Sequence, residues 1–456
     1  MNSSRPPTPS LWLPGRIVAL LGLGAFLLTA TVVRAAPEDA ASGVWITSWA
    51  ASPQGPYPVG AAVAEPDLSF AFPTASANDQ TFRLIVRPDL WSSQMRVRFT
   101  NLVGNQPVSF DGIFVGLQKS GATIEPGTSR PITFSGNGSL TLQPGQTEWS
   151  DPVSLPFVRD AEEANAYLPG RKLAISFHTV GQTGPMTWHA KAMTTSYVTN
   201  PGAGSVGQIE DDASFPTSTT SWYFIDALDM MAARGTQLVV ALGDSITDGT
   251  SSTINGDDRW PNVLARRLHA AYGDRVVVVN EGIGGNQIVG PAVYDPTHPV
   301  AGGPSAVERL SRDVLSLSGV TAVIWHEGTN DVSAGTAAAD IEAGMQAVVQ
   351  KLRASVQGIR VVGTTITSEV GAAGNGGTAQ AAAERIMLND FVKSSGLFDT
   401  VVDFYAVTTD PQTGALKAQY VPNTSIGGAG DHVHPNRAGY LAMGTAVPLR
   451  ALVRPF

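Results

Sequence analysis

The sequence predicts two unlike parts: an all-β first half, and an α/β second half built on a parallel sheet. In the first half, apolar and polar residues alternate over short runs that turn residues separate. In the second half, apolar runs alternate with amphipathic helical patterns. The chain has 456 residues, 43% of them hydrophobic and 15% charged, which suits more than one globular domain with a sizeable core.

The first half, residues 44–199, is expected to form a β-sandwich or jelly-roll-like domain. Its runs TFRLIVRP (81–88) and QMRVRFTN (94–101) alternate as half-buried antiparallel strands do. Further strand candidates are SFDGIFVGLQ, RPITFSG, SLTLQPG, RKLAISFHTV and AMTTSYVT. Gly, Pro, Asn and Asp punctuate these runs at short intervals. Residues 200–235 begin with a polar, Gly-rich stretch and are expected to be a linker.

The second half, residues 236–456, predicts a parallel sheet covered by helices on both faces. Its expected strands are TQLVVALGD, RVVVVNEG, VTAVIWHEG, IRVVGTTIT and DTVVDFYAV. Its expected helices include RWPNVLARRLHAAYG, AADIEAGMQAVVQKLRAS and AAAERIMLNDFVKSSG. In such sheets the functional site lies beyond the carboxyl ends of the strands.

Composition excludes several classes of function. The net charge is −9, and no block of Lys and Arg occurs, so nucleic acid is not an expected partner. The chain has no cysteine, which removes disulfides, thiol catalysis and cysteine metal sites.

The first 35 residues are expected to be a signal peptide that is cut after Ala35. Arg5 and Arg16 precede an apolar run that ends at Val33, and small residues follow it. This order predicts a secreted, periplasmic or extracellular protein with no stable membrane insertion after cleavage. The alternative is a membrane anchor, since the run from Ile17 is just under spanning length. No later stretch is long and apolar enough to span a bilayer.

Chemistry-bearing residues follow the expected strands. They lie in LGDSITDG around Ser245, NEGIGGNQ (280–287), HEGTND (326–331) and GDHVHPNRAGY (430–440). A serine nucleophile needs a base, and histidine serves when a third group fixes its tautomer. Asp431 and His434 are close enough in sequence for a short turn to bring the carboxylate to one ring nitrogen while the other faces Ser245.

A developing oxyanion needs hydrogen-bond donors. The backbone N–H groups of Ser245 and Gly285 and the side-chain amide of Asn330 could supply them. Gly284 is the alternative to Gly285.

Other interpretations of these residues stay open from the residues alone. Ser245 could be a helix N-cap after a buried strand. His432 and His434, with a nearby aspartate, could bind zinc, although the Asp-x-His of a metallophosphatase is missing after the first strand. Neither a metal nor another cofactor is predicted.

The four blocks GDSITDG, GIGGN, GTND and DHVHP resemble those of the SGNH hydrolases, the GDSL family of esterases and lipases. The resemblance covers roughly residues 236–456, with all four blocks in family order. It implies a flavodoxin-like three-layer α/β/α fold. It also implies a nucleophile at Ser245, a base at His434 oriented by Asp431, and oxyanion donors at Ser245, Gly285 and Asn330. The β-rich half, with WITSWAASPQ at its head, resembles the accessory domain of secreted bacterial relatives.

The implied function is that of a secreted carboxylic ester hydrolase. It would act through an acyl-enzyme on short acyl esters, chiefly acetyl esters, with a small ester or an acylated glycan as substrate. One alternative is a lipase or lysophospholipase of the same family. Another, of a different class, is a non-catalytic protein that binds glycan or the cell surface.

Overall fold

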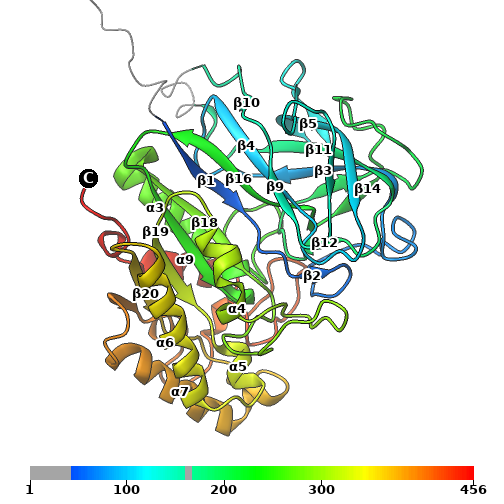
Figure 1. Ribbon diagram of the computed structural model, residues 1–456. Helices are drawn as coiled ribbons and strands as arrows, with labels where there is room; N and C mark the ends of the chain where they lie inside the picture. Colours follow the sequence, from blue (N-terminus) through cyan, green and yellow to red (C-terminus); the bar gives the residue numbers. More distant parts are fainter. Residues whose placement is uncertain (1–42, 160–166) are drawn as a thin grey trace, which may run out of the picture. The chain divides into compact units, whose positions relative to one another are not determined.

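The predicted parallel sheet forms the centre of the second half. The computed structural model describes residues 43–159 and 167–456, so the predicted signal peptide lies outside the described residues. Five parallel strands lie in the order β18-β17-β19-β20-β21. Figure 1 labels β18, β19 and β20 of this sheet. They are β17 (Gln237–Gly243), β18 (Val276–Gly282), β19 (Val320–His326), β20 (Arg360–Thr364) and β21 (Thr400–Val402). This order is that of a doubly wound fold, whose site lies where the order reverses, between β17 and β19.

Helices cover both faces of this sheet. Alternate residues of each strand point to opposite faces, and the apolar side chains on each face pack in a separate core. Val239 packs in one core with Trp260, and its neighbour Val240 packs in the other with Val348. The helices are α2 (Ser245–Asp248), α3 (Trp260–Tyr272), α4 (Ala306–Leu310), α5 (Thr329–Ser333), α6 (Ala338–Ser355), α7 (Ala379–Ser394), α8 (Phe404–Thr408) and α9 (Arg437–Ala446). None of the helices in the described part of the chain has the length and apolar character needed to cross a bilayer.

The fifth predicted strand, residues 399–407, is longer than the observed strand β21. The strand ends at Val402, and the FYAV residues expected in it form α8 instead. Asp403 accounts for the change, because its carboxylate accepts a hydrogen bond from Ala406 N at 3.0 Å and so caps a helix there. Phe404 then packs edge-on against Trp260 beneath the sheet.

The first half consists of antiparallel sheets. One has the order β1-β16-β4-β10, with β9 paired to β4; a second has the order β14-β13-β3-β11-β5-β6, with β7 and β8 paired to β5; the third is β15-β12-β2. The strands are β1 (Val44–Ala50), β2 (Gly55–Pro56), β3 (Asn78–Val86), β4 (Gln94–Thr100), β5 (Val108–Ser120), β6 (Thr123–Ile124), β7 (Arg130–Pro131), β8 (Leu140–Leu142), β9 (Thr147–Trp149), β10 (Val153–Ser154), β11 (Leu173–Gln182), β12 (Thr187–His189), β13 (Ser196–Val198), β14 (Thr217–Thr219), β15 (Trp222–Tyr223) and β16 (Ile225–Ala232).

Aromatic side chains join the two larger sheets. Phe99 of β4 contacts Phe110 of β5 and Phe177 of β11 with edge-on geometry. The core they form is continuous with one core of the parallel sheet, so the two halves pack as one unit. The jelly-roll connection pattern remains a prediction.

The expected linker, residues 200–235, is wrong over its second part. β16 lies there and pairs with both β1 and β4 in the first sheet. Its sequence IDALDMMA has few β-branched residues, so its strand propensity is low. Pairing on both sides and burial define the strand, as do Asp226 and Asp229, which bind Arg98 and Arg96.

Candidate active site

Ser245 lies directly beyond the carboxyl end of β17, as the first residue of α2. The helix N-cap is Asp244, whose carboxylate accepts a hydrogen bond from Ile246 N at 2.9 Å. The interpretation of Ser245 as the N-cap is therefore wrong, because the preceding aspartate has that role. Ser245 is only 5% exposed, and its hydroxyl makes its hydrogen bond outside the helix.

The hydroxyl of Ser245 meets the ring of His434. The distance from His434 Nε2 to Ser245 Oγ is 2.8 Å, and that from His434 Nδ1 to Asp431 Oδ2 is 2.6 Å. The other oxygen of Asp431 accepts hydrogen bonds from the backbone N–H groups of Val433 and His434, both at 2.9 Å. A ring held in this way can accept a proton from the serine on one nitrogen while the carboxylate binds the other.

The Asp431 carboxyl is ionised at neutral pH. Partial burial raises its pKa, but the hydrogen bond and charge of His434, with the backbone donors, lower the pKa well below its ordinary value. The loop that carries both residues ends at Asn436, which caps α9 through Ala438 N and Gly439 N. Helix α9 packs against α3, so this loop is fixed to the body of the fold.

The glycine and asparagine blocks meet at the same edge. Asn330 Nδ2 donates to the carbonyl of Asn286 at 2.8 Å, one residue beyond Gly285. Gly285 has a φ of +82°, a left-handed conformation that favours glycine. The N–H of Gly284 donates to Asp248 at 3.0 Å, so this group is already engaged and Gly285 is the better candidate for an oxyanion donor.

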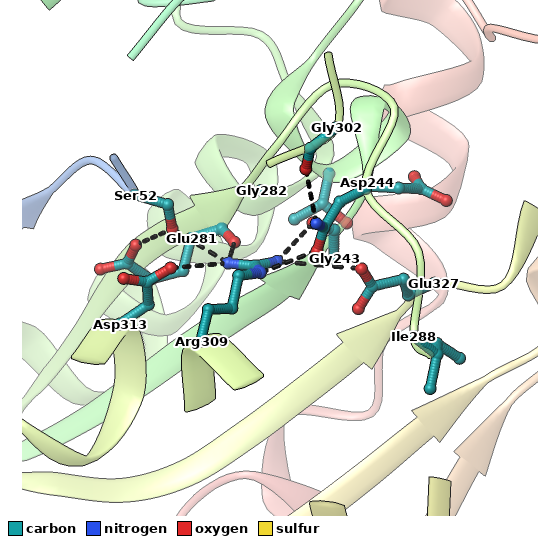
Figure 2. A network of polar contacts seen from close by, with 12 residues as sticks. Ser52, Gly243, Asp244, Glu281, Gly282, Ile288, Gly302, Arg309, Asp313 and Glu327 are labelled. Carbon is teal, nitrogen blue, oxygen red and sulfur yellow. Dashed lines mark hydrogen bonds and ion pairs between the residues drawn. The ribbon is translucent and has the colours of Figure 1, made fainter. Parts of the chain in front are cut away.

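A buried arginine beneath these loops was not predicted from the sequence. Arg309 is 1% exposed, and its guanidinium donates to the carbonyls of Gly243 at 2.9 Å and Glu281 at 2.8 Å (Figure 2). It also donates to Asn286 Oδ1 at 2.7 Å. Arg309 thus ties the ends of β17 and β18 to the residue whose carbonyl binds Asn330. Charged residues in the otherwise apolar segment 306–315 are the only sequence signal.

Carboxylates surround this arginine. Asp313 lies 3.1 Å and Glu327 3.9 Å from its guanidinium nitrogens, and Ser52 of the first half joins the cluster at 3.0 Å (Figure 2). Burial raises the pKa of Glu327 to about 7 and raises that of Glu281 well above its ordinary value. The site is therefore supported by a buried charge network that both halves of the chain supply.

Two further residues near the strand ends have structural contacts. His326 is fully buried, with Nδ1 2.8 Å from Thr364 Oγ1, and burial lowers its pKa to about 3, so the ring is neutral. Asp331 accepts hydrogen bonds from the backbone N–H groups of Ile288 and Val289, at 2.8 and 3.1 Å. Both side chains therefore hold the strand ends and the adjoining loops in place.

A family model matches most of the second half. Residues 241–442 match the model of the GDSL-like lipase/acylhydrolase family, a span that contains Ser245, Gly285, Asn330, Asp431 and His434. A search of curated proteins found no match.

Solved structures with low similarity include three ester hydrolases. A carbohydrate acetylesterase family member from Sinorhizobium meliloti is 19% identical, with 46% of this chain and 94% of that chain covered and a TM-score of 0.34. A GDSL-like lipase from Bacteroides thetaiotaomicron is 19% identical over 46% and 85%, with a TM-score of 0.34. The native aryl esterase of M. smegmatis is 21% identical over 48% and 100%, with a TM-score of 0.34.

Proposed function

Because residues 241–442 belong to the GDSL-like lipase/acylhydrolase family and the chain is thus a serine esterase of this type, we propose that it hydrolyses short acyl esters through Ser245, His434 and Asp431. The observation that carries the proposal is the continuous hydrogen-bonded chain from Ser245 Oγ through the ring of His434 to Asp431. Three groups of these types in this order are what nucleophilic catalysis by serine requires.

In the first step, Ser245 Oγ attacks the ester carbonyl while His434 Nε2 takes the hydroxyl proton. The tetrahedral oxyanion accepts hydrogen bonds from the N–H groups of Ser245 and Gly285 and from the amide of Asn330. One N–H of that amide donates to Asn286, so its second N–H is the one offered to the substrate.

In the second step, His434 gives the proton to the leaving alcohol, and the acyl group remains on Ser245. Water then attacks the acyl-enzyme with the same ring as base, and the acid leaves. Asp431, ionised throughout, binds the ring N–H on Nδ1 and stabilises the imidazolium that forms in both steps.

We propose acetyl and similarly short acyl esters as the substrate class, including acetylated carbohydrates. The low exposure of Ser245 supports a small acyl group, since a long chain needs an open apolar path. The carbohydrate part rests on a fold-level analogy, because β-rich domains of exported proteins often carry sugar-binding surfaces. The expected signal peptide supports export of the protein.

Turnover of p-nitrophenyl acetate tests the proposal. Ser245→Ala is expected to abolish hydrolysis while far-ultraviolet circular dichroism stays unchanged. Ser109→Ala, which removes a half-buried hydroxyl of β5 that lies 2.8 Å from Thr141 Oγ1, is the matched control and is expected to keep full activity. A fluorophosphonate should add once, on Ser245. Full activity of Ser245→Ala, or labelling elsewhere, would exclude this mechanism, and absence of turnover on any ester would favour a non-catalytic binding protein.

A further inference from the structure

A lysine from the β-rich half lies against the glycine block of the hydrolase half. Lys191 follows β12, and its side chain packs on the Cα of Gly284. A Cβ placed on Gly284 would overlap Lys191 Nζ and lie 3.0 Å from Cε and 3.2 Å from Cδ. Because Gly284 directly precedes Gly285, the ammonium of Lys191 lies next to the peptide N–H proposed as an oxyanion donor.

The ammonium of Lys191 has no partner in the described part of the chain, and solvent reaches its nitrogen. The residue is 5% exposed, and its Nζ makes no hydrogen bond or ion pair within residues 43–159 and 167–456. Burial lowers its pKa, and the charges of Asp248, Asp244 and Asp431 act against that shift. An ammonium on a largely buried residue, with three donors that the protein does not use, can give them to solvent or to a bound acceptor.

Each of the three nearby carboxylates is hydrogen-bonded to another group through at least one oxygen, although Asp244 Oδ2 is buried without a partner in the described residues. Asp248 accepts from Gly284 N at 3.0 Å and lies 3.2 Å from His189 Nε2. Asp244 caps α2, and Asp431 binds His434. These contacts leave the ammonium available for a group that comes from outside the chain.

The segment that carries Lys191 is held on both sides. The ring of His189 stacks on Trp222, and its Nδ1 lies 2.9 Å from the carbonyl of Ser52. Ala192 N donates to the carbonyl of Thr220 at 2.9 Å. The position of the lysine is therefore built into the fold and does not depend on a mobile surface chain.

The same region of the first half also holds the glycine block. The amide of Gln54 donates to the carbonyl of Gly284 at 3.1 Å, and its Oε1 accepts from Ala190 N at 3.4 Å. Gln54 thus connects the residue before Lys191 to the glycine that Lys191 covers, which fixes the lysine relative to the reacting centre.

We propose that Lys191 forms an anion subsite, in which its ammonium binds a carboxylate of the substrate beside Gly285, so that the enzyme prefers esters that carry a carboxylate. The inference rests on the proposed ester hydrolysis. A carboxylate fits best because charge-assisted hydrogen bonds are shorter and stronger than neutral ones. The β-rich half then has a role in selecting the substrate.

Two matched ester pairs test the subsite and identify the source of the carboxylate. The first pair compares the p-nitrophenyl monoester of adipic acid with p-nitrophenyl hexanoate, which differ by an acyl-side carboxylate. The second pair compares m-carboxyphenyl acetate with phenyl acetate, which differ on the alcohol side. The wild-type ratio of kcat/KM values, acid over neutral ester, is expected to exceed ~10 in one pair. A ratio of this order corresponds to the free energy of a hydrogen bond to a charged group.

Lys191→Met keeps the length and apolar stem of the side chain and removes the charge. It is expected to lower the ratio of kcat/KM values, acid over neutral ester, about tenfold in the pair that the wild type discriminates. Lys191→Arg keeps the charge and should retain part of the preference for the acid ester. Lys393→Met, which makes the same charge change on the exposed face of α7, is the control and should leave the ratio unchanged.

Adipate binding, measured by calorimetry, tests the subsite apart from turnover. Adipate is expected to bind the wild type and to bind Lys191→Met at least tenfold more weakly. Equal ratios in wild type and Lys191→Met would overturn the proposal, as would an equal loss on both members of a pair, which would indicate a general effect on the oxyanion. Absence of all turnover with adipate binding intact would contradict the proposed hydrolysis and leave the anion subsite supported.

Discussion

The Nδ1 atom of His434 lies 2.6 Å from Asp431 Oδ2, while Nε2 of the same ring lies 2.8 Å from Ser245 Oγ. The Asp431 side chain is 47% exposed, so water reaches the carboxylate. Its two backbone hydrogen bonds hold one oxygen in place and leave the other for the ring. The aspartate can therefore set the tautomer and the orientation of the His434 ring, even though solvent screens the electrostatic interaction between the carboxylate and the ring.

Asp431→Asn is expected to lower kcat on p-nitrophenyl acetate by roughly 10²–10³-fold, because the amide favours the wrong tautomer of His434. The loss should be smaller than for a fully buried aspartate, since water can partly replace the carboxylate. Asp295→Asn is a matched control, because Asp295 and His298 have the same spacing and a 2.9 Å contact in an exposed loop. Unchanged kcat in Asp431→Asn would contradict the assigned role.

Gly285→Ala is expected to lower kcat by at least tenfold with a loss of about 1 kcal/mol in stability, since a side chain is strained at its φ of +82°. The activity loss follows because relief of this backbone strain would move the N–H proposed as an oxyanion donor, while the added Cβ itself makes only an ordinary contact with Gly302 at 3.4 Å. Gly235→Ala has a φ of +87° in open space before β17 and should cost similar stability with no loss of kcat. Equal kcat in both variants would place the oxyanion donor elsewhere.

Arg309→Met is expected to lower the free energy of unfolding by about 3–5 kcal/mol, because it removes a buried cation from beside Glu327 and Asp313, of which Asp313 keeps its ion pair with Arg312. The same change should lower kcat, since Asn286 and the carbonyl end of β17 lose their common donor. Urea unfolding and ester turnover measure the two effects. Arg309→Lys keeps the charge but not the planar guanidinium, so its stability and kcat should lie between those of the wild type and Arg309→Met. This variant keeps the test usable if the methionine variant does not fold.

Arg353→Met is the control for this substitution. Its guanidinium forms an exposed pair with Asp399 at 3.0 Å, and such pairs contribute about 0–1 kcal/mol. A similar loss of stability in the two methionine variants would show that Arg309 is not a central support of the site.

The sequence was sufficient for the parallel sheet because its signals are local. The runs that became β17, β18, β19 and β20 are continuous and rich in β-branched residues, and each begins and ends close to its predicted bounds. The polar blocks could be placed at one edge because the carboxyl ends of parallel strands share an edge. The catalytic roles of Ser245 and His434 stay predictions.

The parts that were missed depend on partners that are distant in sequence. β16 has a weak propensity, and pairing with β1 and β4, far away in the chain, makes it a strand. Arg309 is one of several charged residues in its segment, and Lys191 lies in no recognisable motif. The structural role of Arg309 depends on contacts such as that with Ser52, 257 residues away, and the role of Lys191 depends on its contact with Gly284. The hydrophobic periodicity within one half of the sequence does not predict contacts between the two halves.

A histidine on α3 makes stability depend on pH. His269 Nε2 lies 3.0 Å from Asp89 of the first half, and Nδ1 lies 3.6 Å from Asp274. Burial lowers the pKa of His269, but hydrogen bonds and charges of Asp274 and Asp89 raise it to about 10. Because the folded pKa lies above the unfolded value of about 6.5, the folded state holds this proton more tightly.

His269→Gln is therefore expected to destabilise the protein by about 1.5–3 kcal/mol at pH 6, the size of a hydrogen bond to a charged group. This stabilisation is complete below pH ~6.5 and is lost as the pH rises through about 10, so the difference between wild type and variant should shrink over that window. Urea unfolding at pH 6 and pH 10 measures it. His298→Gln, in an 86% exposed position, should show no such trend, and a constant difference for His269→Gln would mean that the ring acts by packing alone.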